Sequence, residues 1–312
     1  MPLDYAWASA IWLTVIQVSL IAATMLTLTM YPWKQPPWLL ALTILWSLLC
    51  YHSARTIFLG QFAGVVYLFI ILCLWALHTQ HDIGAGVVLA LTTLKPQMAF
   101  LLIPGLLLWA LFNRRWRFVI ASAVTMGILL LLSFALEPTW LADFLKQLAQ
   151  YPAYTAIGSP IWVVTHHYLP FLGRPVEIML SLLATGWLLY AWGYAFRPNQ
   201  TAGAFHWAVG VTLVVTNLVA LRTATTNYVM MYPVLFLGLK LLAGRIPHGL
   251  GYVALFYAVS FVGLWALFFV TVDGQFEHPI IYLPLPFGLT ALLLLGRSAL
   301  EEAAVTPLEQ RR

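Results

Sequence analysis

The sequence predicts an all-α protein, a bundle of transmembrane helices that crosses the membrane many times. Of the 312 residues, 62% are hydrophobic and only 8% are charged, whereas a soluble domain carries about 25% charged residues. The apolar residues form runs such as 119–136 and 253–272, which are long enough to need lipid as their solvent. Membrane β-strands alternate apolar and polar residues, and these runs show no such alternation. The composition therefore excludes a cytosolic enzyme, a disordered protein and a nucleic-acid-binding domain, and no nucleic-acid partner is expected.

Nine full spans are predicted from apolar stretches of about 17 to 25 residues. In order, they cover residues 6–30, 37–54, 60–78, 118–136, 175–195, 204–221, 228–244, 250–272 and 280–296. The first residues lack a basic run and a small-residue cleavage site, so 6–30 is interpreted as a span and not as a signal peptide. No repeat or soluble segment interrupts the series, and residues 1–312 are expected to form a single membrane-embedded domain.

One apolar region, 83–112, does not fit a single span. Two arms, 83–94 and 98–112, flank the tripeptide Lys95-Pro96-Gln97. Proline lacks an amide hydrogen and disfavours helix in the residue before it, so the chain should break there. Each arm would be about 18 to 22 Å long, which is short for a hydrocarbon core of about 30 Å. We therefore expect a helical hairpin with this tripeptide at its tip, in the outer half of the membrane.

The orientation follows from the basic residues, because short cytoplasmic loops are enriched in lysine and arginine. The densest basic loop, 113–117, is placed inside, and the basic residues near 197, 240–245 and 297 then fall inside as well. The acidic loop 273–278 falls outside. Residues 137–174 are expected to be an extracytoplasmic interfacial loop with short amphipathic helices. Residues 297–312 are expected to be a cytoplasmic tail, solvated from 301 onward.

Polar residues gather near the outer ends of the predicted spans, although ionisable groups within a membrane are costly and usually face protein or water. They are Arg55, Gln61, Lys95, Gln97, His166, His167, Arg222, Asn227 and Tyr228. Several cations on one side indicate a bound anion. Arg55 is interpreted as an ordinary span-end arginine. The adjacent histidines point to different helix faces and predict no metal site, and no cofactor is expected.

Two cations carry the anion-binding hypothesis, and each has a plainer alternative. The Lys95 ammonium at a broken hairpin tip suits a phosphate, or it simply snorkels to the outer headgroups. Arg222 begins a polar stretch at an outward-facing helix N-terminus, where free backbone amides favour a bound anion. In the plainer alternative, this stretch only caps the helix. The outer carboxylates, including Asp273 and Glu277, are interpreted as loop charges, and no general base is assigned.

Several short motifs, in order, resemble glycosyltransferase family 87. They are Leu59-Gly60-Gln61, residues 85–90 leading to Lys95-Pro96-Gln97, the run Arg114-Arg115-Trp116-Arg117, and residues 222–228 followed by Tyr232-Pro233. The resemblance spans about 6–296 and implies a GT-C membrane fold. It also implies inverting transfer of a hexose, with mannose expected, from a polyprenyl-phosphate-sugar donor to a lipid or glycan acceptor. The active site would lie on the extracytoplasmic side of a plasma (inner) membrane protein.

The same resemblance implies roles for the candidate residues. Lys95 and Arg222 would bind the donor phosphate, and Gln61, Gln97, His166, Asn227 and Tyr228 would contact substrate. GT-C enzymes place a catalytic aspartate in the first outer loop, and this sequence has no matching residue, so we expect a chain that lacks N-terminal spans or an inactive copy. A transporter or lipid-handling protein is the alternative, because broken helices also build carrier sites. The lack of an inverted repeat favours the enzyme.

Overall fold

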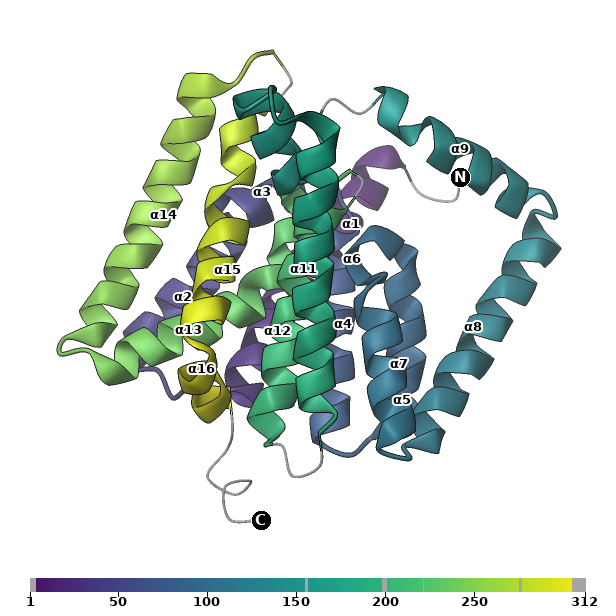
Figure 1. The fold of residues 1–312 in the computed structure, drawn as a ribbon, viewed down its shortest axis with the longest axis horizontal. Coiled ribbons are helices and arrows are strands. Elements are labelled where there is room, and N and C mark those ends of the chain that lie inside the picture. Colours follow the sequence, from purple (N-terminus) through teal and green to yellow (C-terminus); the bar gives the residue numbers. More distant parts are fainter. Residues whose placement is uncertain (1–3, 155–156, 198–200, 221, 275–276, 305–312) are drawn as a thin grey trace.

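The computed structural model describes residues 4–154, 157–197, 201–220, 222–274 and 277–304, and its regular elements are all helices (Figure 1). Six helical segments are long and apolar enough to cross a membrane. They are α1 (Tyr5–Met30), α8 (Trp116–Leu136), α11 (Gly173–Ala195), α12 (Ala202–Val219), η3 with α13 (Thr225–Arg245) and α14 (Gly249–Thr271). The expected multi-pass helical architecture is confirmed.

The predicted count of nine full spans is not confirmed. The stretch 37–54 is two helices, α2 (Pro37–Leu49) and α3 (Tyr51–Phe58), bent by 50° at Cys50. The last stretch, η4 (Pro279–Tyr282) with α15 (Pro284–Leu295), bends by 90° into α16 (Arg297–Ala304), and α4 (Ala63–His78) has 16 residues. Counting each bent pair as one span raises the six to at most eight in the described residues. A hydropathy window averages composition, and it does not detect where a helix breaks.

The predicted break at residues 95–97 is present. The first arm is α5 (Asp82–Leu91), continued by the short 3-10 helix η1 (Thr92–Leu94), and the second arm is α7 (Leu102–Phe112). Between them Lys95 leaves helical geometry, with φ −136° and ψ 78°, and Pro96 starts the one-turn helix α6 (Pro96–Ala99). Both arms rise from the same end of the bundle, and their tip stops short of the opposite end (Figure 1).

Close helix packing holds the hairpin in place. α5 packs against α4 on one side and α8 on the other, and at Gly86 the backbones of α5 and α8 nearly touch. A Cβ added at Gly86 would lie 2.4 Å from the carbonyl oxygen of Phe118. The Ser122 hydroxyl donates a hydrogen bond to the Gly86 carbonyl oxygen at 3.1 Å. Small residues at such crossings let membrane helices approach and gain packing contacts.

We expect Gly86→Val to destabilise the protein by about 3 kcal/mol, because the new side chain would force two backbones apart. The midpoint of unfolding in a denaturing-detergent titration measures the effect. Gly84→Val is the matched control, since a Cβ at Gly84 meets nothing within 4 Å. Equal midpoints for the two variants would contradict the proposed role of this helix crossing.

The interior of the bundle is built around α12, most of which is buried. It packs against α11, α15 and α16, and near its C-terminal half also against α6 and η3. Two indoles tie it to its neighbours: Trp207 donates to the carbonyl oxygen of Leu293, and Trp192 donates to the Thr212 hydroxyl. The helix that leads to Arg222 is therefore the most enclosed of the six long helical segments described above.

Residues 301–304 of the expected solvated end are not a free tail: with 297–300 they form α16, which packs under α12 and α13. Leu300 and Ala304 are fully buried. Arg297 pairs with Glu301 at 2.8 Å and its guanidinium lies 3.5 Å from the ring centre of Tyr194. The charges that suggested solvent exposure instead satisfy each other. Residues 305–312, with Arg311 and Arg312, lie outside the described residues, and the cytoplasmic side remains a prediction.

Residues 137–174 contain the short helices expected there. They are α9 (Trp140–Tyr154), α10 (Pro160–Trp162) and the π-helix η2 (Val163–Tyr168). The hydroxyl of Ser159 accepts a hydrogen bond from the backbone amide of Trp162 and so caps α10. In Figure 1, α9 lies across the upper end of the bundle, away from the central helices. Residues 155–156 lie outside the described residues.

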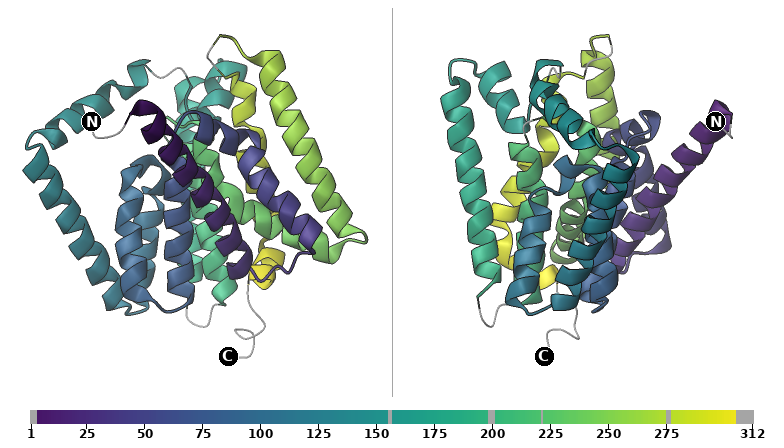
Figure 2. Two further views of the ribbon diagram at one scale, coloured as in Figure 1. Left: turned by 180° about the vertical axis from the view of Figure 1, so that it is seen from behind. Right: turned by 90° about the vertical axis from the view of Figure 1, so that its right-hand side faces the viewer.

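The two ends of the bundle differ in charge, as the loop pattern predicts. The lower end in Figure 1 carries the α7–α8 connection, the C-terminal end of α13 and α16, which hold most of the basic loop residues. The upper end carries α9 and the segment that leads from α14 to η4. The view from behind shows the same grouping, with the N-terminus at the upper end (Figure 2). We use "upper end" and "lower end" in this sense below.

Candidate functional site

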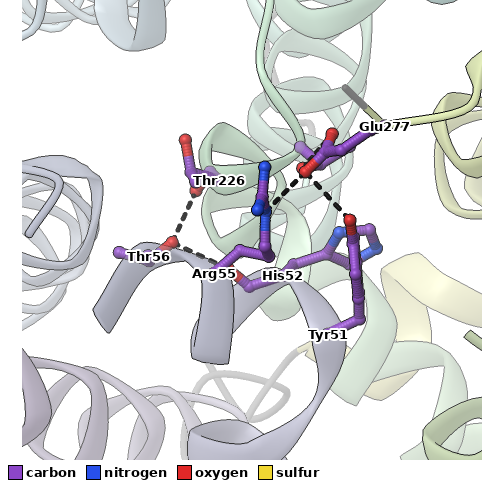
Figure 3. Close-up of polar contacts among 7 residues, drawn as sticks. Tyr51, His52, Arg55, Thr56, Thr226 and Glu277 are labelled. Atoms are coloured by element: carbon purple, nitrogen blue, oxygen red, sulfur yellow. Dashed lines mark hydrogen bonds and ion pairs between the residues drawn. The ribbon is translucent and has the colours of Figure 1, made fainter. Parts of the chain in front are cut away.

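The bend at Cys50 aims the polar side chains of α3 at the segment after α14. Cys50 has an extended backbone, with ψ 144°, which interrupts the helical hydrogen bonds between α2 and α3. The sequence of α3 then places Tyr51, His52, Arg55 and Thr56 in one and a half turns. Figure 3 shows these side chains reaching toward Glu277 and the start of η3. A polar half-helix is therefore held at the upper end by its own kink.

Glu277 is the centre of this arrangement. Its Oε1 lies 2.7 Å from Arg55 Nε and accepts a hydrogen bond from the Tyr51 hydroxyl at 2.9 Å (Figure 3). The Thr225 hydroxyl is close enough to both carboxylate oxygens to donate to either, at 2.8 and 2.9 Å. Glu277 is only 8% exposed. A buried charge is tolerated when it is paired and hydrogen-bonded, and here a cation and two hydroxyls meet that need.

This cluster corrects two sequence interpretations. Arg55 is an ion-pair partner of a distant residue and not an ordinary span-end arginine, and Glu277 is not a free loop charge. Sequence reasoning missed the pair because 222 positions separate the partners. The available signal was a histidine and an arginine close together in an apolar stretch, which is costly unless they are partnered.

The short helix η3 (Thr225–Met231) forms the wall behind α3. Every residue of η3 is buried. The hydroxyl of Thr56 donates to the backbone carbonyl oxygen of Thr226 at 3.1 Å (Figure 3). The Tyr228 hydroxyl donates to the carbonyl oxygen of Tyr282, and the Tyr228 ring is fully buried. Asn227 is 3% exposed, and its side-chain oxygen has no hydrogen-bond partner among the described residues.

Lys95 and Gln61 come together at the other end of α3. The Lys95 ammonium donates to the side-chain oxygen of Gln61 at 3.1 Å, and Lys95 is 8% exposed. Gln61 follows the turn after α3, where Gly60 adopts φ +59°, a conformation that favours glycine. Among the described residues, no carboxylate lies within 4 Å of this ammonium. Gln97 is half-buried in the first turn of α6.

Arg222 lies against a different partner. Its guanidinium is 5.3 Å from the ring centre of Trp162, a favourable cation–π separation. The His166 ring stacks on the same indole, with centroids 5.2 Å apart and planes 7° apart. His166 also lies 3.6 Å from Glu177. Arg222 therefore belongs to the α10–η2 corner of the upper end, while Lys95 belongs to the hairpin tip.

The predicted site residues thus fall into three neighbouring groups. Lys95 and Gln61 are in direct contact, Asn227 and Tyr228 belong to η3, and Arg222 and His166 share the Trp162 ring. The C-terminal end of α3 links the first two groups, because the backbone amide of Gln61 donates to the carbonyl oxygen of Thr56 at 2.9 Å and the Thr56 hydroxyl donates to η3. Their functional roles remain predictions.

A cavity of about 300 Å³ opens beside Glu277 at the upper end. Its lining includes Glu277, Asp273, His167, His278 and Trp162. The two histidine rings lie 5.8 Å apart, edge to face. Two carboxylates, two imidazoles and an indole can hydrogen-bond and stack on a hydroxylated ligand. The buried ammonium of Lys95, by contrast, suits an anion.

Comparison with known proteins identifies one family. Residues 1–220 of the 312 match the model of glycosyltransferase family 87. The match includes Lys95 and Gln61 and ends just before Arg222, so it leaves η3 and Glu277 outside. No curated protein and no solved structure matches the chain.

Proposed function

Because the chain belongs to glycosyltransferase family 87, we propose that it transfers a hexose, with mannose as the expected sugar, from a polyprenyl-phosphate-sugar donor. The acceptor is a hydroxyl of a lipid or glycan on the extracytoplasmic side of the plasma membrane. Family membership is the observation that carries this proposal. The helical membrane fold agrees with it, since a polyprenyl donor resides in the bilayer.

In this proposal Lys95 binds the donor phosphate. The ammonium is buried, and it donates a hydrogen bond to the neutral amide of Gln61. A buried cation without a carboxylate partner is poised for an anionic ligand, because an unpaired buried charge is costly. As the glycosyl bond breaks, negative charge grows on the departing phosphate. A cation already held in place stabilises that charge without further reorganisation.

The remaining candidates surround this point in the proposal. Arg222 supplies a second cation for the phosphate, and Gln61 and Gln97 orient its oxygens from two sides of the hairpin tip. Asn227 offers a buried side-chain oxygen without a partner in the described residues, which suits a sugar hydroxyl, since buried polar groups are nearly always hydrogen-bonded. Tyr228 shapes the wall, because its hydroxyl already donates to Tyr282. His166 lies at the rim beside Trp162.

The donor class is tested by a transfer assay on the purified protein in lipid nanodiscs. We expect radiolabel to move from polyprenyl-phosphate [³H]mannose to a membrane lipid extract or glycan acceptor. GDP-[³H]mannose, offered under the same conditions, should give no transfer, because the site is proposed to recognise a lipid monophosphate. Transfer from the nucleotide sugar but not from the lipid donor would overturn the proposal. In proteoliposomes of the same protein, movement of the donor across the bilayer without sugar transfer would favour a carrier.

A further inference from the structure

A groove of about 560 Å³ runs between α14 and α15, over α13 and the kink of α2 and α3. Its lining is almost entirely apolar, with Leu235, Leu264, Leu289 and Phe256 as typical members. α14 and α15 carry exposed apolar side chains along their lengths, as expected of helices in contact with lipid. The groove is large enough for a bound ligand, which typically occupies about 300–1,000 Å³.

Two glycines keep this groove hollow. Gly263 on α14 and Gly288 on α15 both line it, and a Cβ added at either position would meet nothing within 4 Å. These glycines are therefore not required for close helix packing, unlike Gly86. Glycine in a helix costs about 1 kcal/mol relative to alanine, and no packing contact in the described residues accounts for that cost here.

One buried polar group faces the groove. His52 lines it and is 1% exposed, and its Nδ1 has no hydrogen-bond partner among the described residues. Its ring packs against Tyr51 and Tyr228, with centroids 5.7 and 5.1 Å apart. A buried ring nitrogen without a partner indicates a ligand atom that can hydrogen-bond. The groove is thus suited to a molecule that is mostly apolar but carries a polar atom at the level of His52.

The groove and the polar cavity beside Glu277 are lined by successive parts of the same elements. Leu267 lines the groove and Thr271 lines the cavity, one helical turn further along α14. On the other side Pro279, the first residue of η4, lines the cavity, and Pro284, the first residue of α15, lines the groove. The apolar groove and the polar cavity therefore follow one another along the same pair of elements, as the two halves of an amphipathic binding site would.

The charge of the cavity selects the kind of head group. Asp273 and Glu277 line it, and no lysine or arginine is among its described lining residues. Because Arg55 neutralises Glu277, Asp273 is the charge that disfavours an anionic phosphate at that place. Carboxylates, imidazoles and the Trp162 indole instead suit a neutral head rich in hydroxyls. The anionic donor fits Lys95 better, on the opposite end of α3. A lipid with a neutral head would therefore bind at the cavity, and the lipid phosphate of the donor would bind at Lys95.

We infer that the groove and the cavity together bind a neutral glycolipid, with its apolar chain between α14 and α15 and its sugar head in the cavity beside Glu277. His52 hydrogen-bonds the oxygen that joins chain and head. The binding of this glycolipid is inferred from the groove and the cavity alone. That the glycolipid is the acceptor of the sugar rests on the proposed function. The acceptor is then a membrane lipid and not a soluble glycan.

Photolabelling of the full chain in nanodiscs tests the inference. The probe is octadecyl β-mannoside with a diazirine in its chain, and labelled peptides are mapped by mass spectrometry. We expect labelling concentrated on α13, α14 and α15. Unlabelled octadecyl mannoside should compete with the probe, whereas octadecyl phosphate and methyl mannoside, which lack the neutral head and the chain respectively, should compete at least tenfold less well.

Glycine substitutions make the test specific. Gly263→Leu and Gly288→Leu add side chains at positions where a Cβ meets nothing within 4 Å, and each should lower labelling at least fivefold by filling the groove. Gly186→Leu on α11 is the matched control, since a Cβ there also meets nothing within 4 Å and Gly186 does not line the groove. Its labelling should equal that of the unsubstituted protein. Labelling spread over all lipid-facing helices, or unchanged in the two groove variants, would mean ordinary surrounding lipid and would overturn the inference.

The same preparation separates this inference from the proposed function. If the probe labels the groove as expected but no sugar moves from the lipid donor, the transferase proposal fails and the glycolipid site stands. If sugar transfer is intact in the two groove variants and labelling is unspecific, the site assignment fails and the transferase proposal stands. Equal competition by octadecyl phosphate would reject the neutral head and point to an anionic lipid.

Discussion

Lys95→Ala is expected to lower the rate of sugar transfer by about 10²–10³-fold, the usual effect of removing one preorganised charge-stabilising group. The ammonium is buried and is proposed to bind the donor phosphate, and Gln61 holds it in place. Since the loss concerns charge that grows in the transition state, kcat should fall more than KM rises. Initial rates with polyprenyl-phosphate mannose measure both constants.

The fold should survive this substitution, because alanine leaves no buried charge behind and only the amide oxygen of Gln61 loses a donor. The unfolding midpoint in denaturing detergent checks this point. Lys34→Ala is the matched control, since Lys34 is exposed in the connection between α1 and α2, at the lower end. An unchanged kcat/KM for Lys95→Ala, in a protein with an unchanged midpoint, would remove Lys95 from the proposed site.

Glu277→Ala should destabilise the protein by about 3–5 kcal/mol, the typical result of removing one partner of a buried ion pair. The substitution leaves the Arg55 guanidinium without its counter-charge and takes the acceptor from the hydroxyls of Tyr51 and Thr225. This carboxylate joins three elements, α3, η3 and the segment after α14, in addition to the hydrogen bond from Thr56 to the Thr226 carbonyl oxygen. A shift of the unfolding midpoint, measured as above, reports the loss.

Two comparisons distinguish the effect of breaking the buried ion pair from the effect of removing any charged side chain. Glu302→Ala removes a partner of the exposed Arg245–Glu302 pair and should cost less than about 1 kcal/mol. The double variant Arg55→Leu with Glu277→Leu removes both charges, and it should be more stable than Glu277→Ala because no buried charge is left unpaired. Similar midpoints for Glu277→Ala and Glu302→Ala would show that the cluster does not hold the upper end together.

The membrane character of the chain and most of its helices could be predicted from the sequence. Hydropathy identified the location of every long helix, because burial in lipid imposes an apolar run on each one. The break at Lys95-Pro96-Gln97 was also predictable, since proline acts on its immediate neighbours. The bend at Cys50 and the inward turn of α16 were not, because no proline marks either position within the predicted span and both depend on what the following residues pack against.

The candidate site was predictable only in part. Lys95 and Gln61 attracted attention separately as polar residues near the outer ends of spans, and the structure adds that they share a hydrogen bond. Arg55 and Glu277 were each assigned a plain role, since nothing in their local sequence refers to the other. The groove beside His52 could not be predicted from the sequence either, because its walls come from five separate helices, α2, α3, α13, α14 and α15.

The sequence by itself determined which segments are apolar enough to enter the membrane, where the hairpin breaks, and which loops carry most of the basic residues. These properties depend on hydrophobicity and backbone preference within a few turns of helix. Only the tertiary structure decided that Tyr51 and Arg55 meet Glu277, and that an apolar groove leads to the cavity beside that carboxylate. The physical reason is that ion pairing and cavity shape are set by packing between segments more than 200 residues apart.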